Sequence, residues 1–207
     1  MDLISLFSMS FIIALSGALM PGPLLAAVMN ESLRNGSKAG PLMTLGHAIP
    51  ELIIVALIAM GLTYIMNIQV IIKSIALLGS AVLFFFGISM IFNARNTHAL
   101  QHTPQQSSCS WMVIRGLVMS ITNPYWSLWW LTVGGGLIIS AQKSGLIGLA
   151  IFFSGHIIAD LAWYTFVSIS LAKSKKLISP NVYRWIIMLC GGILVIFALL
   201  FLKELTC

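Results

Sequence analysis

The sequence predicts an all-α, polytopic membrane protein with six transmembrane helices, arranged as two inverted-topology repeats of three. Of its 207 residues, 59% are hydrophobic and 8% are charged, whereas soluble domains are about 25% charged. The apolar residues form long continuous runs, and a histidine–acid signature recurs in the two halves of the chain. The composition and the runs indicate the membrane, and the recurrence indicates the repeat.

A helix that crosses a bilayer needs about 20 mostly apolar residues. A membrane β-barrel would show short alternating segments instead. The first apolar stretch follows Asp2 rather than the cationic start of a signal peptide, so we expect it to be a retained helix. Six stretches reach the required length, roughly 3–30, 41–66, 69–92, 112–140, 145–172 and 184–203.

The basic side chains are distributed unequally between the two sides of the predicted membrane. By the positive-inside rule, the side with more Lys and Arg is cytoplasmic. We therefore expect the cytoplasmic (inner) cell membrane, with both termini outside, and the net charge of +6 does not indicate a nucleic-acid partner. The loops after spans 1, 3 and 5 hold or adjoin Arg34, Lys38, Arg95, Arg115, Lys173, Lys175, Lys176 and Arg184, and the other side holds Lys73, Lys143 and Lys203.

We expect a single membrane domain over residues 1–207. Its half-repeats would be 1–95 and 112–207, joined by the polar linker 93–111. Each half has three spans, an odd number, so the second half would enter the membrane in the opposite sense. Inverted repeats of this kind are common in secondary transporters, whose binding sites lie near the bilayer midplane.

The second span of each half carries the same short signature. "GHAIPELI" begins at Gly46 and "GHIIADLA" begins at Gly155. In both, an acid follows the histidine by four residues: Glu51 follows His47, and Asp160 follows His156. Residues four apart share one face of a helix. Because a charged group at the bilayer centre is costly, such groups normally face a cavity or a partner. The alternative is a pair that only fixes helix packing.

The first span of each half contains a helix breaker. Pro21, Gly22 and Pro23 interrupt the first span, and Asn123 and Pro124 interrupt the fourth. Proline inside a helix removes a hydrogen bond and clashes with the preceding turn, although membrane helices tolerate simple kinks. A helix that restarts at proline has an electropositive end that can hold an anion. All of these residues are therefore predicted to lie at a substrate or ion site.

This set of groups suits a zwitterion. Glu51 and Asp160 would bind an ammonium group or carry protons, while His47 and His156 would tune or relay them. The helix starts would hold a carboxylate. The aromatic segment "YWSLWW" (Tyr125 to Trp130) could line this chamber, because an ammonium group can lie on an indole face, or it could only pack.

Near the cytoplasmic end of the first span, Asn30 and Glu31 are expected to lie at a solvated helix end. The alternative is a gate pair with Arg34.

The first half resembles the LysE/RhtB family of amino-acid exporters. The family pattern is Pro-Gly-Pro, a cytoplasmic loop with Arg, Gly and Ala-Gly, and a Gly-rich helix that carries an acid. "ITNPYWSLWW" is similar to the family's Asn-Pro-Lys element, with Tyr125 in place of lysine, and Pro50 stands before the acid where glycine is usual. The matching positions are Pro21, Gly22, Pro23, Arg34, Gly36, Ala39, Gly40, Gly46 and Glu51.

The resemblance implies a secondary active exporter of amino acids or related small amines, driven by an ion gradient, most simply of protons. The partners would be the amino acid, the coupling ion and the lipid bilayer, and the sequence leaves open whether the chain forms a homo-oligomer. We expect neither a cofactor nor enzyme activity. Its three cysteines, Cys109, Cys190 and Cys207, have no metal-ligand or redox spacing.

A divalent-metal ion transporter is the alternative. Histidine and acid four residues apart in spans 2 and 5 resemble the zinc site of cation diffusion facilitators. Imidazole and carboxylate are suitable zinc ligands. The four ligands would be His47, Glu51, His156 and Asp160.

Overall fold

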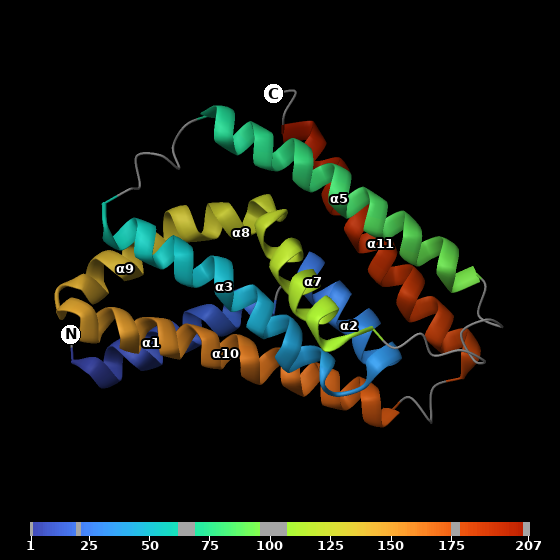
Figure 1. Ribbon diagram of the computed structural model, residues 1–207, viewed down its shortest axis with the longest axis horizontal. Helices are drawn as coiled ribbons and strands as arrows, with labels where there is room; N and C mark the ends of the chain where they lie inside the picture. Colours follow the sequence, from blue (N-terminus) through green and yellow to red (C-terminus); the bar gives the residue numbers. More distant parts are fainter. Residues whose placement is uncertain (1, 20–21, 62–68, 96–106, 175–178, 205–207) are drawn as a thin grey trace.

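The computed structural model describes residues 2–19, 22–61, 69–95, 107–174 and 179–204. Within these ranges the regular elements are all helical, which confirms the predicted all-α class (Figure 1). In chain order they are α1 (Leu3–Ala18), α2 (Pro23–Asn35), α3 (Ala39–Ala59), α5 (Gln69–Arg95), α7 (Cys109–Ile121), α8 (Pro124–Trp129), the π-helix η1 (Trp130–Gly134), α9 (Gly135–Gln142), α10 (Gly145–Ser174) and α11 (Pro180–Glu204).

Two of the described helices, α3 and α10, are each long and apolar enough to cross a membrane. The pair α1 and α2 meets the same criterion together, with a bend of 75° between its members. Large apolar side chains such as Ile53 and Phe166 are exposed on these helices. The chain is thus a membrane protein with two or three candidate spans among its described residues, and the six-span inverted repeat stays a prediction.

The predicted break in the first span is present. Helix α1 ends at Ala18, and α2 begins at Pro23. Gly22, the residue before α2, has an extended backbone and provides no side-chain cap. Proline suits the first helical position because its φ angle is already helical and its missing N–H would have had no partner there. Pro21, which the sequence analysis assigned to the same break, lies outside the described residues.

The predicted break in the fourth span is also present. Helix α7 ends at Ile121, and α8 begins at Pro124. The carbonyl of Asn123 accepts the N–H of Trp126 at 3.0 Å, which starts the new helix. The helix then loosens into the π-helix η1 before α9. Short π-helical segments are frequent at functional sites, and this one begins at Trp130, the last residue of the aromatic segment.

The predicted linker 93–111 overlaps a helix at each end, and its role as the junction of two half-repeats stays a prediction. Helix α5 continues to Arg95, and α7 already begins at Cys109. Both ends of the linker are therefore helical, and its residues 96–106 lie outside the described part of the chain.

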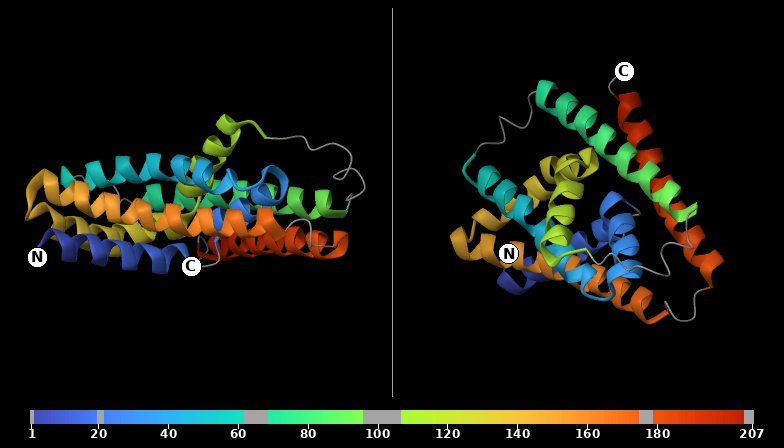
Figure 2. Two further views of the ribbon diagram at one scale, coloured as in Figure 1. Left: turned by 90° about the horizontal axis from the view of Figure 1, so that it is seen from below. Right: turned by 45° about the vertical axis from the view of Figure 1, so that its right-hand side comes forward.

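The three most extensive helix pairs are α5 with α11, α1 with α10, and α3 with α7. Figure 1 shows α5 and α11 side by side, and Figure 2 shows the same pair from two further directions. Each pair joins a helix from the first half of the chain to one from the second.

Two glycines let the inner pairs approach closely. A Cβ atom on Gly46 of α3 would lie 1.9 Å from the Val113 carbonyl oxygen of α7. A Cβ atom on Gly155 of α10 would lie 2.7 Å from the Phe7 carbonyl oxygen of α1. Small residues at such crossings are typical of membrane helix packing. Each glycine directly precedes a signature histidine, so both histidines lie next to a helix crossing.

Candidate functional site

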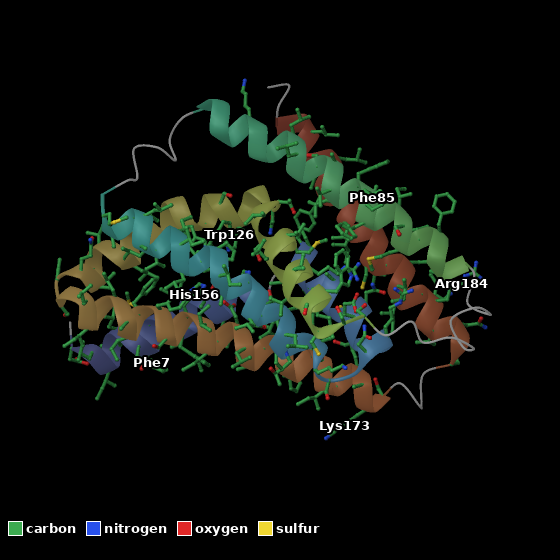
Figure 3. All side chains as sticks on the ribbon, in the orientation of Figure 1. Phe7, Phe85, Trp126, His156, Lys173 and Arg184 are labelled. Atoms are coloured by element: carbon green, nitrogen blue, oxygen red, sulfur yellow. The ribbon has the colours of Figure 1, made fainter. Side chains whose placement is uncertain are left out.

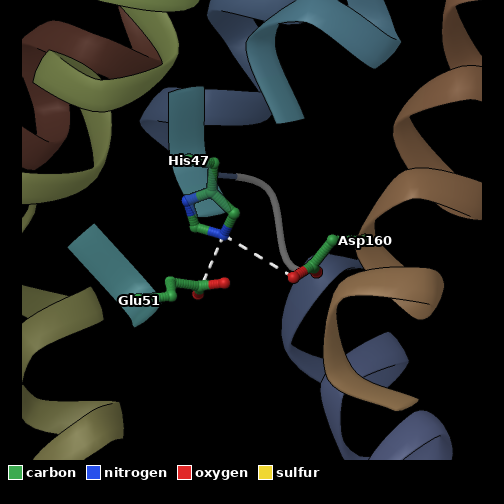
Figure 4. A group of neighbouring side chains, drawn as sticks. All are labelled: His47, Glu51 and Asp160. Carbon is green, nitrogen blue, oxygen red and sulfur yellow. Dashed lines mark ion pairs between the residues drawn. The ribbon is translucent and has the colours of Figure 1, made fainter. Parts of the chain in front are cut away.

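Four buried side chains from α3 and α10 meet between the two helices. The Nε2 atom of His47 lies 3.0 Å from Glu51 Oε1 and 3.7 Å from Asp160 Oδ2 (Figure 4). The Nε2 atom of His156 lies 3.2 Å from Glu51 Oε1 and 3.4 Å from Asp160 Oδ2. Imidazoles and carboxylates therefore alternate around a closed ring, which we call the tetrad.

The sequence explains how the tetrad forms. Each histidine and the acid four residues later lie on one face of their helix. The glycine before each histidine sets a close crossing with a helix of the other half, and α3 and α10 also contact each other directly. The structure thus brings together the two signatures that the sequence analysis paired.

The two oxygens of Glu51 have different surroundings. Oε1 lies near the Nε1 atoms of Trp126, at 3.1 Å, and Trp130, at 3.2 Å, as well as near both histidines. Oε2 is buried and has no hydrogen-bond partner within the described residues. Asp160 Oδ2 also accepts no hydrogen bond there, although it lies within ion-pair distance of both histidines. A buried polar atom without a partner costs about 1–3 kcal/mol. These two oxygens are therefore the acceptors best placed to receive a further N–H donor.

A cavity of about 110 Å³ lies against the tetrad. It is bordered by both helix breaks and by the aromatic segment of α8 and η1. Pro124 begins α8 directly after Asn123, while Pro21 lies outside the described residues. Of the predicted site residues, the cavity lining includes Gly22, Pro23, His47, Glu51, Asn123, His156 and Asp160.

The tryptophans of the aromatic segment belong to this cavity. Trp126, Trp129 and Trp130 all line it. The ring centroids of Trp129 and Trp130 lie 5.1 Å and 4.9 Å from that of His156. Figure 3 shows Trp126 and His156 in the same region of the molecule. The sequence left open whether this segment lines a chamber or only packs, and these three rings do line one.

Two polar side chains at the site escaped the sequence analysis. Ser120 of α7 contacts His47 Nδ1 at 2.5 Å. The ring of Tyr164, on α10, lies edge-on to that of His47, with centroids 6.4 Å apart. Tyr164 follows Asp160 by four residues, so helical periodicity was a usable signal for it. For Ser120 no local signal existed, because its partner is 73 positions away.

The expectation for Glu31 was wrong. Its side chain is fully buried rather than solvated, and its partner is Arg115 of α7 rather than Arg34. The Asn35 amide donates a hydrogen bond to the second carboxylate oxygen, and the Ser107 N–H donates to Asn35 Oδ1 at 2.9 Å. Burial of this acid is tolerated because both of its oxygens are paired.

The tetrad has the chemistry of a cation site. Ligand atoms of His47, Glu51 and Asp160 all lie within 4.8 Å of one another. Carboxylates and imidazoles can bind a divalent metal, and carboxylates can equally bind an ammonium group. The apolar and aromatic rest of the cavity is typical of a site for a small organic molecule.

An apolar helical chain that encloses a cavity with buried histidines and carboxylates, and with broken helices at its wall, belongs to the class of membrane transport proteins. A family model described as "LysE type translocator" matches residues 15–205. The chain therefore belongs to the LysE type translocator family.

Two curated relatives are similar over most of their length. The protein named "Putative amino acid efflux protein YcgF", from Bacillus subtilis (strain 168), is 23% identical over 198 residues, which is 95% of each chain. The "Uncharacterized membrane protein YahN" of Escherichia coli (strain K12) is 27% identical over 189 residues, 89% of this chain and 83% of that protein. No solved structure matches the chain significantly. These comparisons support a transporter and give the metal-transport alternative no support.

Proposed function

We propose that the protein is a secondary active exporter of amino acids or related small amines, coupled to protons. The observation that carries this proposal is the cavity between two broken helices, with two carboxylates and two imidazoles at its wall. Membership of the LysE type translocator family and the similarity to YcgF support the same function.

The substrate's ammonium group would bind at the tetrad. Glu51 Oε2 and Asp160 Oδ2 are the buried carboxylate oxygens without a hydrogen-bond partner in the described part of the chain, and both residues line the cavity. A hydrogen bond to a charged group contributes about 1.5–3 kcal/mol. The indole rings beside the tetrad would add a cation–π attraction.

The substrate's carboxylate would bind at the start of α2. The first N–H groups of a helix have no partner within it, and Gly22 provides no side-chain cap. Leu24 and Leu25, in the first turn after Pro23, both line the cavity. Anions are favoured at such a helix start. On the opposite wall, Asn123 and the helix start at Pro124 would complete the site.

Charge balance couples the substrate to protons. With both histidines protonated and both acids ionised, the tetrad carries no net charge. The substrate's ammonium would add one positive charge at the tetrad itself, since its carboxylate would lie apart at the start of α2, and a buried uncompensated charge is expensive. Binding would therefore be favoured when one histidine releases its proton. The exchange of one ammonium for one proton keeps the charge at the tetrad unchanged, and a proton gradient would then drive export.

The helix contacts support an inverted repeat. Helix α3 of the first half packs on α7 of the second, and α10 of the second half packs on α1 of the first, each through the glycine of its signature. The proposed arrangement has six spans in the cytoplasmic membrane, with both termini outside. The two halves would rock about the tetrad to expose the cavity to either side, as other inverted-repeat transporters do.

The experiment is proton-driven flux of each of the twenty amino acids, with zinc and cadmium in parallel, into liposomes that contain the purified protein. The expected result is flux of at least one amino acid that Glu51→Gln and Asp160→Asn each abolish. Asp2→Asn is the matched control, because it also removes one carboxylate charge and asparagine still caps α1. Wild-type flux in both tetrad variants would contradict the proposal. Flux of metal alone would favour the metal transporter.

A further inference from the structure

Ser120 lies between its own helix and the tetrad. Its side chain is buried in α7. Its Oγ atom lies 2.7 Å from the carbonyl oxygen of Gly116 and 2.5 Å from Nδ1 of His47. The first separation is an ordinary hydrogen-bond distance and the second is shorter than usual, so each contact needs a hydrogen between its two heavy atoms.

Counting hydrogens assigns the tautomer of His47. A serine hydroxyl has one hydrogen to donate. The Gly116 carbonyl oxygen can only accept, so the serine hydrogen must lie in that contact. The hydrogen in the second contact must then come from His47, as Nδ1–H donated to Ser120 Oγ. Any other placement leaves two oxygens, or an oxygen and a nitrogen, in close contact with lone pairs facing each other.

This assignment fixes where His47 exchanges its proton. With Nδ1 carrying a hydrogen in both protonation states, only Nε2 can gain or lose one. Nε2 lies 3.0 Å from Glu51 Oε1 and 3.7 Å from Asp160 Oδ2. Among the described residues, the other ionisable groups that face His47 are on α10, namely His156 and Tyr164. Every proton that His47 exchanges therefore passes on the side of the carboxylates.

The corresponding position in the other half has no serine. Val113 of α7 contacts Gly46, and Ser120 follows Val113 by seven positions. Phe7 of α1 contacts Gly155, and the residue seven positions after Phe7 is Ala14. Ala14 is therefore the counterpart of Ser120. Ala14 and Ser120 both line the cavity. The Nδ1 atom of His156 is buried, with no hydrogen-bond partner among the described residues. The two histidines thus occupy equivalent positions, but Nδ1 of His47 contacts a serine hydroxyl, whereas Nδ1 of His156 has no hydrogen-bond partner among the described residues.

We propose that Ser120 is a positioning residue that holds His47 as the Nδ1–H tautomer and thereby makes His47 the histidine that releases and recovers the exchanged proton. The role in exchange rests on the proposed proton-coupled export. The tautomer itself does not depend on any transport.

The first test is ¹⁵N NMR of the full chain in lipid nanodiscs, with labelled histidine and His47→Gln to assign the signals. The wild type should show neutral His47 protonated at Nδ1. Ser120→Ala should move the neutral ring toward the Nε2–H form, and Ser120→Thr should keep the wild-type pattern. Ser10→Ala is the matched control, because Ser10 is also buried and donates to a helix carbonyl, that of Phe152, at 2.7 Å. An unchanged His47 spectrum in Ser120→Ala would overturn the proposal.

The second test is flux kinetics of the same variants. Proton transfer by a positioned group contributes about 100-fold or more to a rate, so partial loss of positioning should lower kcat about tenfold. KM should stay within about twofold, and Ser120→Thr should restore kcat. An altered tautomer with wild-type kcat in Ser120→Ala would overturn the role in exchange. A wild-type protein that moves no amine would overturn the proposed function instead, and the NMR result would still decide the tautomer.

Discussion

Arg115 of α7 forms a buried ion pair with Glu31 of α2. Glu31 is fully buried and Arg115 is 8% exposed. The Arg115 guanidinium also lies 5.1 Å from the ring centroid of Phe86 on α5. The pair therefore joins helices from both halves of the chain at one place. It lies about a turn along α7 from Met119, which lines the cavity.

Loss of one partner of this pair should destabilise the protein strongly. Glu31→Gln or Arg115→Gln leaves the other charge buried and uncompensated, at a cost of about 3–5 kcal/mol. The measurement is the unfolding free energy in detergent. Arg34→Gln is the matched control, since Arg34 is close in sequence, remains partly exposed and does not pair with Glu31. Equal unfolding free energies for Arg115→Gln and Arg34→Gln would contradict the prediction.

A methyl group at Gly46 should disrupt the crossing of α3 and α7. The added Cβ would lie 1.9 Å from a backbone oxygen, which cannot move aside alone. Gly155→Ala should be less harmful, because the corresponding distance is 2.7 Å. We expect a loss of about 1–3 kcal/mol at Gly155 and more at Gly46. Both losses would be measured as the decrease in unfolding free energy in detergent.

Gly192→Ala is the control for the two glycine substitutions. Gly192 is also helical, in α11, but a Cβ there would meet no atom within 4 Å. Alanine is the better helix former by about 1 kcal/mol, so this variant should be as stable as the wild type or more stable. Destabilisation equal to that of Gly46→Ala would show that the crossing is not the cause.

The indole N–H groups that face Glu51 should stabilise the protein in addition to the packing of their rings. Trp130→Phe retains an aromatic ring but removes the donor 3.2 Å from Glu51 Oε1. A hydrogen bond to a charged group contributes about 1.5–3 kcal/mol, so the unfolding free energy should fall by that amount. Trp185→Phe is the control because Trp185 is exposed on α11. Identical denaturation curves for the two variants would refute the role of the donor.

Labelling of Cys109 should report the orientation of the chain. Cys109 is exposed at the start of α7, whereas Cys190 is buried in α11. With Cys207→Ser as the background, a membrane-impermeant maleimide should label inside-out vesicles and leave intact spheroplasts unlabelled, because the proposed topology makes Cys109 cytoplasmic. The readout is the mass of the purified protein. Labelling of spheroplasts alone would reverse the proposed topology.

Local sequence rules predicted the parts of the site that lie on one helix. The four-residue spacing placed His47 beside Glu51, and the prolines placed the helix breaks, because periodicity and missing N–H groups act locally. The recurrence of the signature also indicated that the two pairs would meet. The tryptophan lining stayed open, since an aromatic residue packs equally well against lipid or beside a cavity.

Distant contacts outside the repeated signature could not be predicted. Glu31 and Arg115 are 84 positions apart, and Ser120 is 73 positions from His47. Which side chains meet at a helix crossing depends on the angle and register of packed helices, and one helix does not specify these for another. Glu31 was therefore placed at a solvated end on the basis of its polarity, and Ser120 was overlooked.

The pairing of α1 with α10, α3 with α7 and α5 with α11 has a consequence for how the protein is made. Neither half can cover its own apolar faces, so residues 1–95 would leave the ribosome with their main partners still unsynthesised. The tetrad can close only after α10 has entered the membrane, when most of the chain is complete. The lipid bilayer, or an insertion factor, must shelter the early helices until then, and two separately expressed halves should assemble only with each other.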